Sequence, residues 1–255
     1  MSPGRLDRHL VDVGVVSSRE KAKEVILRGD VSVNQVVTTK PSHLVTADDE
    51  VVVTDSQMDV GRGAGKLRAA LDHFGLDVSG MTALDVGAST GGFSQVLLER
   101  GAATVVALDV GHGQLDPTIA SDSRVKALEG VNIVDMSPER WASLSLPTPI
   151  DVVVCDVSFI SLTAVIPTLQ QLCGPGAHWL LLVKPQFEVG KGKTRQGVVL
   201  YEHDRRVALD TVLQACAIQG RAECSWVDSP VVGKKGNREF LLYCPAEDPH
   251  QAPSG

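Results

Sequence analysis

The residues with the clearest chemical meaning lie in segment 83–93, where a short apolar run opens into a glycine-rich turn before a helix-forming stretch. Gly87, Gly91 and Gly92 let a ligand approach the main chain closely, and Asp85 supplies an acceptor beside the turn. The order Gly-x-x-x-Gly-Gly differs from the Gly-x-Gly-x-x-Gly of dinucleotide sites. The turn predicts a site for an adenosine ligand with a charged amino-acid tail, although such a corner also occurs for structural reasons alone.

Polar side chains also follow the later apolar runs. Asp109, Asn132, Asp156 and Lys184 each come at or just after the end of a successive predicted strand. Asp109 stands about 24 residues after the glycine motif begins, where a ribose-binding carboxylate is expected, with a helix cap as its structural alternative. Asn132 is placed to address an adenine or to form a turn.

Asp156 and Lys184 end strands that we expect to be buried on both faces, where Asp and Lys are seldom found unless they are paired or functional. A partly desolvated lysine near other cations can act as a general base toward a hydroxyl, whereas a simple ion pair is an equally good interpretation. Lys66 joins these groups if its helix runs antiparallel to the first strand, and Glu239 joins them if the last strand is antiparallel to the others.

Composition narrows the class of protein. The chain has 255 residues, of which 43% are hydrophobic, and a formal net charge of −7, so any contact with nucleic acid must come from local basic patches. Its apolar runs are far shorter than the ~20 residues that cross a bilayer, and no signal peptide is evident, so a cytoplasmic protein is expected. Five widely spaced cysteines without a Cys-x-x-Cys indicate buried reduced thiols, with neither a disulfide framework nor a zinc cluster.

The start of the chain reads as a compact helix–helix–strand module. Apolar spacing predicts a helix over residues 5–13, and Ser17 with Glu20 forms a capping-box pattern for a second helix that ends at Gly29. Segment 31–37 then alternates with period two, as a strand does.

After a polar, glycine-rich stretch, apolar strands alternate with helices, which predicts a mostly parallel sheet covered by helices on both faces. The expected strands are residues 83–86, 105–110, 125–128, 151–156 and 179–184, then strands near Trp226 and Phe240, with a helix over 204–218. Because the carboxyl ends of parallel strands meet at one edge, the polar groups should converge there.

Two sets of residues could contact a polyanion. In the second half of the chain, Lys191 and Lys193 lie on a loop that could bind phosphates, while Phe159 or Phe187 could stack on an extruded base. The alternative is a solvated loop. The N-terminal helices carry basic residues, partly offset by acidic ones, in a mixture that is usually a solvated face. Those we expect to meet RNA are Arg5, Arg8, Arg19, Lys23 and Arg28, with Arg62 before the second domain.

Taken together, these motifs resemble the TlyA family over nearly the whole chain. Residues 5 to about 50 look like an S4 RNA-binding domain, and the catalytic motifs that match are 62–67, 85–93, 111–115, 156–162, 184–192 and 236–239. The resemblance implies an S4-like domain over residues 1–54 and an FtsJ-like domain over 66–246. The polar, glycine-rich composition predicts a linker over 55–65, and a disordered tail is expected over 247–255. The implied fold class is α/β: a Rossmann-like methyltransferase domain, whose mostly parallel seven-stranded sheet has an antiparallel last strand, preceded by a small α+β domain.

The resemblance also implies the site. A Lys-Asp-Lys-Glu tetrad falls on Lys66, Asp156, Lys184 and Glu239, with Lys184 deprotonating a ribose 2′-hydroxyl and the other three tuning and positioning it. S-adenosylmethionine would be the cofactor, with no metal. The residues expected around it are Asp85, Gly87, Ala88, Ser89, Thr90, Gly91, Gly92, Phe93, Asp109, Asn132 and Asp156.

The implied activity is 2′-O-methylation of cytidine in ribosomal RNA of the large subunit; some family members also act on the small subunit RNA, so one or both subunits are substrates. Ribosomal RNA and ribosomal subunits are the expected partners, and a membrane is not. Two alternatives stay open: a membrane-active protein, as the family's old hemolysin label suggests, and an RNA-binding protein without catalytic activity. Two departures from the family pattern are Gly65, where a histidine is more usual, and an S4-like module that is less basic than expected.

Overall fold

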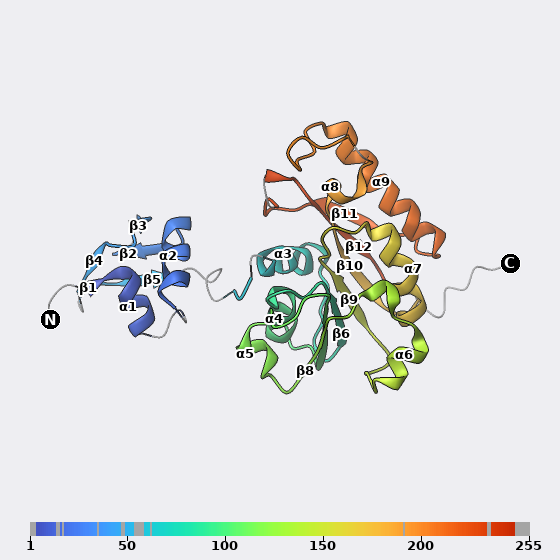
Figure 1. The fold of residues 1–255 in the computed structure, drawn as a ribbon, viewed down its shortest axis with the longest axis horizontal. Coiled ribbons are helices and arrows are strands. Elements are labelled where there is room, and N and C mark those ends of the chain that lie inside the picture. The colour runs from blue at the N-terminus through green and yellow to red at the C-terminus, as the bar shows by residue number, and fades with distance from the viewer. Residues whose placement is uncertain are drawn as a thin grey trace. The chain divides into compact units, whose positions relative to one another are not determined.

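The computed structural model describes residues 4–13, 16, 18–34, 36–46, 49–53, 59–61, 63–190, 192–233 and 236–247, and of Arg28 the backbone only. By its internal contacts the chain divides into two compact units, Met1–Asp59 and Val60–Gly255 (Figure 1).

In its described residues, the first unit has two helices and two small antiparallel sheets. Its elements are β1 (Gly4–Arg5), α1 (Leu6–Asp12), α2 (Arg19–Arg28), β2 (Val31–Val33), β3 (Val36–Thr38), β4 (Leu44–Val45) and β5 (Val51–Val53). β1 pairs with β4, and β2 lies between β3 and β5. The predicted strand over 31–37 is therefore a hairpin, because Asn34 turns the chain with a φ of 49°.

Helix α2 begins one residue later than the capping-box pattern predicts. Ser18 is its N-cap, and its Oγ accepts a hydrogen bond from the Lys21 N–H at 3.2 Å. Ser17 lies outside the described residues. Two adjacent serines offer the same capping chemistry, so the sequence pattern alone leaves the start of the helix uncertain by one residue. Gly29 ends the helix as predicted, in the left-handed conformation.

The second unit is a three-layered α/β domain. Its strands are β6 (Thr82–Val86), β7 (Thr104–Asp109), β8 (Val125–Glu129), β9 (Val152–Cys155), β10 (His178–Val183), β11 (Ser225–Asp228) and β12 (Phe240–Cys244). Its helices are α3 (Ala64–Phe74), α4 (Gly92–Glu99), α5 (Pro117–Ala120), α6 (Pro138–Ser143), α7 (Leu162–Cys173), α8 (Pro185–Glu188) and α9 (Glu202–Ile218), with a 3-10 turn η2 (Ile133–Asp135).

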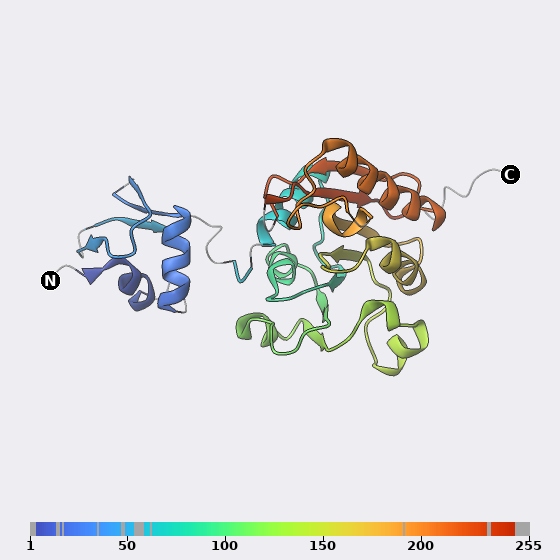
Figure 2. The same ribbon diagram turned by 45° about the horizontal axis from the view of Figure 1, so that its top comes forward.

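The seven strands form one sheet in the order β11-β12-β10-β9-β6-β7-β8. β12 runs antiparallel to both of its neighbours, whereas β6 to β10 pair in parallel with one another. Helices α3, α4 and α5 pack on one face and α6, α7 and α9 on the other, each face with its own buried apolar cluster (Figure 2). The predicted fold class, including the antiparallel last strand, is confirmed.

The predicted linker over 55–65 falls on both sides of the division between the units. Residues 54–58 and 62 lie outside the described part of the chain. The Val60 N–H donates to Gln95 Oε1 on α4 at 2.8 Å, and α3 already begins at Ala64. Of the predicted tail, Glu247 is described, with its N–H bonded to the Pro175 carbonyl at 2.9 Å, and residues 248–255 are not.

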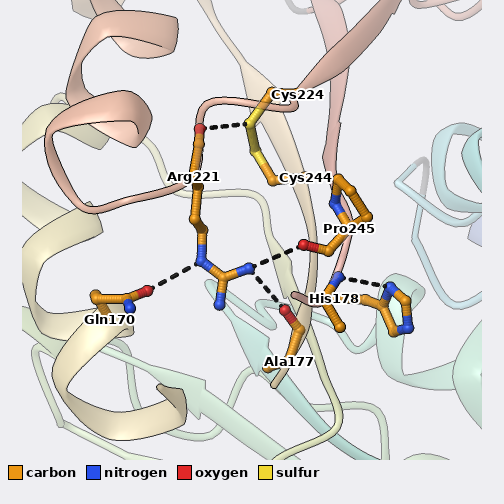
Figure 3. Close-up of a disulfide and its surroundings, with 8 residues drawn as sticks. Gln170, Ala177, His178, Arg221, Cys224, Cys244 and Pro245 are labelled. Atoms are coloured by element: carbon orange, nitrogen blue, oxygen red, sulfur yellow. Dashed lines mark hydrogen bonds between the residues drawn. A yellow bond between two sulfur atoms is a disulfide. The ribbon is translucent and has the colours of Figure 1, made fainter. Parts of the chain in front are cut away.

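The expectation of reduced cysteines is wrong for one pair. Cys224 and Cys244 form a disulfide with their Cα atoms 4.3 Å apart, beside the buried Arg221 (Figure 3). The antiparallel register pairs Ser225 with Tyr243, so the two cysteines stand opposite each other one step further along the ladder. Cys155 and Cys216 are buried free thiols, and burial raises the pKa of each to about 12. The Cys216 sulfur lies within 4.8 Å of both disulfide sulfurs.

We expect Asp7→Asn to loosen the first unit. The Asp7 side chain is fully buried and accepts hydrogen bonds from the Arg5 and Arg19 guanidinium groups at 3.0 Å, which hold its pKa at about 2. Losing these charge-assisted bonds should speed amide exchange of α1 and α2 about tenfold in the full chain, measured by mass spectrometry. Asp12→Asn, which removes an exposed pair with Arg8, is the matched control. Equal exchange in both variants would contradict this role of Asp7.

Candidate active site

A cavity of about 280 Å³ opens at the carboxyl ends of β6, β7 and β9. Its walls combine apolar side chains with backbone and polar groups from the strand ends, as ligand pockets do. The lining residues are Val86, Gly87, Ser89, Leu108, Asp109, Val110, Gln114, Asn132, Ile133, Asp156, Val157, Ser158, Phe159 and Ile160.

The glycine-rich turn serves both the cavity and the packing beneath it. Gly87, with a φ of 85°, lines the cavity, and a Cβ atom there would lie 2.7 Å from the Asp156 carbonyl oxygen. Gly91 has a φ of 94°, and a Cβ there would lie 2.8 Å from Leu115. Of the residues predicted at the cofactor, Ala88, Thr90, Gly91, Gly92 and Phe93 do not line the cavity. Their place in the fold is the start of α4 and its packing.

Four of the predicted polar residues do line it: Ser89, Asp109, Asn132 and Asp156. The Asp109 carboxylate ends β7, and its two oxygens accept hydrogen bonds from the Ser89 and Gly111 N–H groups at 2.8 and 2.7 Å. These bonds fix the carboxylate and leave further lone pairs for ligand hydroxyls. Asn132 caps η2, where its Oδ1 accepts from the Val134 N–H at 3.4 Å, so both interpretations of this residue find support in its position.

Asp85 is enclosed and does not line the cavity. The Ser94 hydroxyl donates to its Oδ2 at 2.6 Å, and its Oδ1 has no hydrogen-bond partner among the described residues. Burial raises the pKa of this carboxyl to about 7, against the lowering effect of the Ser94 hydrogen bond. Contact of Asp85 with a cofactor stays a prediction.

Two lysine–carboxylate pairs stand beside the cavity. In the first, Lys66 Nζ on α3 donates to Glu239 Oε2, just before β12, at 2.6 Å. The two side chains are 9% and 2% exposed, so each charge is almost entirely removed from water and depends on the other.

The second pair contains Lys184, at the end of β10, and Asp156, at the end of β9. Lys184 Nζ lies 2.5 Å from Asp156 Oδ1, but that oxygen makes no aligned hydrogen bond in the described part of the chain. The directional bond of Lys184 goes instead to the Ser158 hydroxyl, which accepts it at 2.8 Å. Charge thus holds Lys184 to Asp156, and geometry ties it to Ser158.

The strand register brings the two pairs to the same edge. Val183 is paired with Phe240 across β10 and β12, so Lys184 and Glu239 follow on neighbouring strands at the next step of the ladder. On the other side, a Cβ on Gly63, the N-cap of α3, would lie 3.5 Å from Asp156 Oδ2. All four predicted tetrad residues are therefore at the edge where the cavity opens.

Two aromatic rings lie next to these charges. Phe159 lines the cavity, yet it is 92% exposed and has a φ of 65°, a backbone conformation that bulky residues rarely adopt. Its ring centroid is 5.3 Å from that of Phe187 on α8. Glu188 on α8 ties this helix to the start of α7. Its carboxylate accepts hydrogen bonds from the Ser161 hydroxyl at 2.5 Å and from the Leu162 N–H at 2.9 Å.

The predicted RNA contacts elsewhere are only partly described. In the first unit, Arg5 and Arg19 are bonded to Asp7, the exposed Arg8 is near Asp12, and Lys23 is exposed. The Arg28 side chain, Arg62 and Lys191 lie outside the description. Lys193 Nζ pairs with Asp204 at 2.7 Å, which ties its loop to α9.

Sequence reasoning missed three residues that organise this edge. Ser158 and Glu188 are polar residues within segments 156–162 and 184–192, whose motifs gave no reason to choose them. Gly233 packs against the Glu239 carboxylate, because a Cβ there would collide with Glu239 Oε1. A signal for Ser158 did exist, since it stands two residues beyond Asp156 at a strand end.

Known proteins resemble both units. Residues 60–244 match the FtsJ-like methyltransferase family and residues 4–51 match the S4 domain. The "16S/23S rRNA (cytidine-2'-O)-methyltransferase TlyA" of Mycobacterium tuberculosis is 43% identical over 94% of this chain and 88% of its own length. "Hemolysin A" of Brachyspira hyodysenteriae is 37% identical over 94% of this chain and 98% of its own length.

A solved structure from Streptococcus thermophilus that carries a hemolysin name has a TM-score of 0.72 at 32% identity and covers 96% of this chain and 89% of its own. Within the described residues, we find no helix with the length and apolar character needed to span a membrane.

We expect Asp85 to make the stability of the second unit depend on pH. A carboxyl with a pKa of about 7 in the fold and an ordinary value when unfolded stabilises the fold in its protonated form. The free energy of unfolding should therefore fall as pH rises from about 4 to about 7, by up to about 4 kcal/mol, and Asp85→Asn should lack this fall.

Urea unfolding followed by tryptophan fluorescence measures this, because Trp141, Trp179 and Trp226 all belong to the second unit. Asp210→Asn, at an exposed position on α9, is the control and should behave as the parent does. Parallel pH curves for the parent and Asp85→Asn would contradict the assignment.

Proposed function

Because this chain belongs to the TlyA family of FtsJ-like methyltransferases, we propose that it transfers a methyl group from S-adenosylmethionine to the 2′-hydroxyl of a cytidine ribose in ribosomal RNA. The large subunit RNA is the first substrate in this proposal and the small subunit RNA the second. The observation that carries the proposal is the pair of lysine–carboxylate contacts at the edge of one strand-end cavity.

The cavity suits the cofactor that the family uses. Leu108, Ile133 and Ile160 offer apolar walls for a purine, and the Asp109 carboxylate is held open toward ribose hydroxyls by two backbone N–H groups. At Gly87 the backbone approaches the Asp156 backbone so closely that a Cβ would collide with it, which brings these two strand ends together at the cavity. In our proposal Asp109, Asn132 and the Gly87 turn bind the cofactor, which when bound supplies an electrophilic methyl group on a sulfonium.

The residues of the chain then have to hold the ribose and remove one proton. We assign that proton to Lys184 Nζ, whose neutral amine would take it from the 2′-hydroxyl while the ribose oxygen bonds the methyl carbon, the carbon–sulfur bond breaks and the donor leaves as a neutral thioether. Asp156, 2.5 Å away, holds the resulting ammonium by charge. Glu239, anchored by Lys66, supports the neighbouring strand end. Alignment of the two substrates should supply much of the rate.

The RNA has to present a single nucleotide to this edge. Phe159 is exposed at the mouth of the cavity in a conformation that costs about 1–3 kcal/mol, and such strain at an exposed aromatic residue is best explained by a role in binding. We infer that Phe159, with Phe187 behind it, stacks on the extruded base. The S4 unit would contact ribosomal RNA through its basic helices. A cytoplasmic location accords with this substrate.

Lys184→Ala should strongly reduce methyl transfer. Ribosomal subunits that lack the mark are incubated with methyl-labelled cofactor, and label on cytidine ribose is measured by nuclease digestion and mass spectrometry. Loss of the general base should reduce kcat by about 10²–10⁴-fold, with cofactor binding by calorimetry retained. Lys126→Ala, which alters an exposed lysine on β8, is the control and should match the parent. An inactive parent, or an active Lys184→Ala, would refute the proposal.

Phe159→Ala should weaken use of the RNA much more than binding of the cofactor. Loss of one base–aromatic stack corresponds to about 1–3 kcal/mol, so kcat/KM for the subunit should fall about 5- to 150-fold. Phe159→Tyr keeps the ring and should stay close to the parent. A Phe159→Ala variant with the parental kcat/KM for RNA would remove the stacking role.

A further inference from the structure

Ser158 makes the directional hydrogen bond to Lys184. Its hydroxyl accepts from Lys184 Nζ at 2.8 Å, whereas the closer contact with Asp156 is an ion pair without an aligned hydrogen bond. Ser158 also lines the cavity and is exposed, while Lys184 is 9% exposed. The serine thus lies between the buried amine and the space that a substrate enters.

The geometry of an amine gives this contact a consequence. A lysine ammonium has three N–H bonds that rotate about the Cε–Nζ axis. When it loses a proton, two N–H bonds and one lone pair remain, and the rotation decides where the lone pair points. An ion pair fixes the position of the nitrogen but holds the rotation only weakly. One aligned hydrogen bond restricts the rotation.

Ser158 can restrict the rotation without adding charge. A second carboxylate in its place would favour the ammonium further, because a nearby negative charge stabilises the charged form. A hydroxyl accepts one N–H and is neutral, so it orients the amine at a smaller cost to its basic form. Among the described residues, the charged groups on the elements next to Lys184 are Asp156 after β9, Glu239 before β12 with its partner Lys66, and Glu188 on α8.

We propose that Ser158 is a positioning residue for methyl transfer, which aims the lone pair of Lys184 at the ribose hydroxyl by holding one of its N–H bonds. This inference rests on the proposed function, because it assumes that Lys184 is the base. It gives three residues of segment 156–159 separate roles. Asp156 pairs with the charge of Lys184, Ser158 orients the Lys184 lone pair, and Phe159 stacks on the base.

The test compares Ser158→Ala, Ser158→Thr and Ser158→Cys in the full chain with subunit substrate. Loss of a hydrogen bond to a charged group should reduce kcat of the Ala variant about 10- to 100-fold, with KM for cofactor and for RNA within about twofold of the parent. Thr restores the hydroxyl and should recover most of the rate. Cys keeps the size with a poorer acceptor and should fall between the two.

Two measurements distinguish a loss of Lys184 orientation from a loss of folded protein. The rising limb of the pH–rate profile should move to lower pH in Ala but not in Thr, because the ammonium has lost an acceptor. Without cofactor or RNA, the rate at which acetic anhydride labels Lys184, followed by mass spectrometry, should show the same displacement. Ser143→Ala on α6 is the control, since its hydroxyl bonds only the helix carbonyl of Arg140 among the described residues.

The outcomes are distinct. A parent that does not methylate the RNA defeats the proposed function. An active parent whose Ala variant has the parental kcat, pH profile and Lys184 labelling overturns the inference alone. A rise in KM for the cofactor with kcat unchanged also overturns it, because Ser158 would then act in cofactor binding and not on Lys184. Should Ser158→Ala fail to fold, Thr and Cys decide by the same measurements.

Discussion

The active edge depends on the burial of Glu239 against Lys66. A carboxylate that is 2% exposed is stable only beside a cation, and the ammonium that supplies it is 9% exposed and 173 residues away in sequence. Removing either partner would leave the other as an unpaired buried charge, which is far costlier than losing a surface pair. The pair therefore joins the first helix of the second unit to its last strand. Because Glu239 and Lys184 lie on neighbouring strand ends, the position of Lys184 depends on how β12 packs in the sheet.

The topology explains why this pair can exist at all. β12 enters between β10 and β11 and runs opposite to both, so its first residue arrives at the edge where the parallel strands end. A parallel β12 would bring Cys244 there and send Glu239 to the far edge. The same inversion sets Cys224 opposite Cys244, so one feature of the sheet accounts for both the buried ion pair and the disulfide.

Sequence periodicity is sufficient to predict the strands and the convergence of the polar groups. The apolar runs end in Asp109, Asp156 and Lys184, and parallel strands place their carboxyl ends at one edge of the sheet. The residues of β12 do not give its direction, since a short apolar strand has the same pattern in both directions; only the family resemblance implies the antiparallel orientation. The disulfide was missed for the same reason: it depends on strand register, which spacing along the chain does not encode. The enclosed position of Asp85 likewise reflects packing by Ser94 on α4, not its place at a strand end.

Segment 156–162 shows how the fold couples chemistry to recognition. Its first residue, Asp156, forms the ion pair with Lys184, and its middle carries Ser158 and Phe159. At its end, Ser161 and Leu162 donate hydrogen bonds to Glu188 on α8. Burial raises the pKa of Glu188, yet its two hydrogen bonds to Ser161 and Leu162 favour the charged form. Helix α8 begins directly after Lys184 and carries Phe187. The hydrogen bonds of Glu188 therefore fix the position of Lys184 and Phe187 relative to Ser158 and Phe159. A nucleotide that stacks on Phe159 is thereby positioned by the same short segment that orients the base, so binding and proton removal share one rigid support.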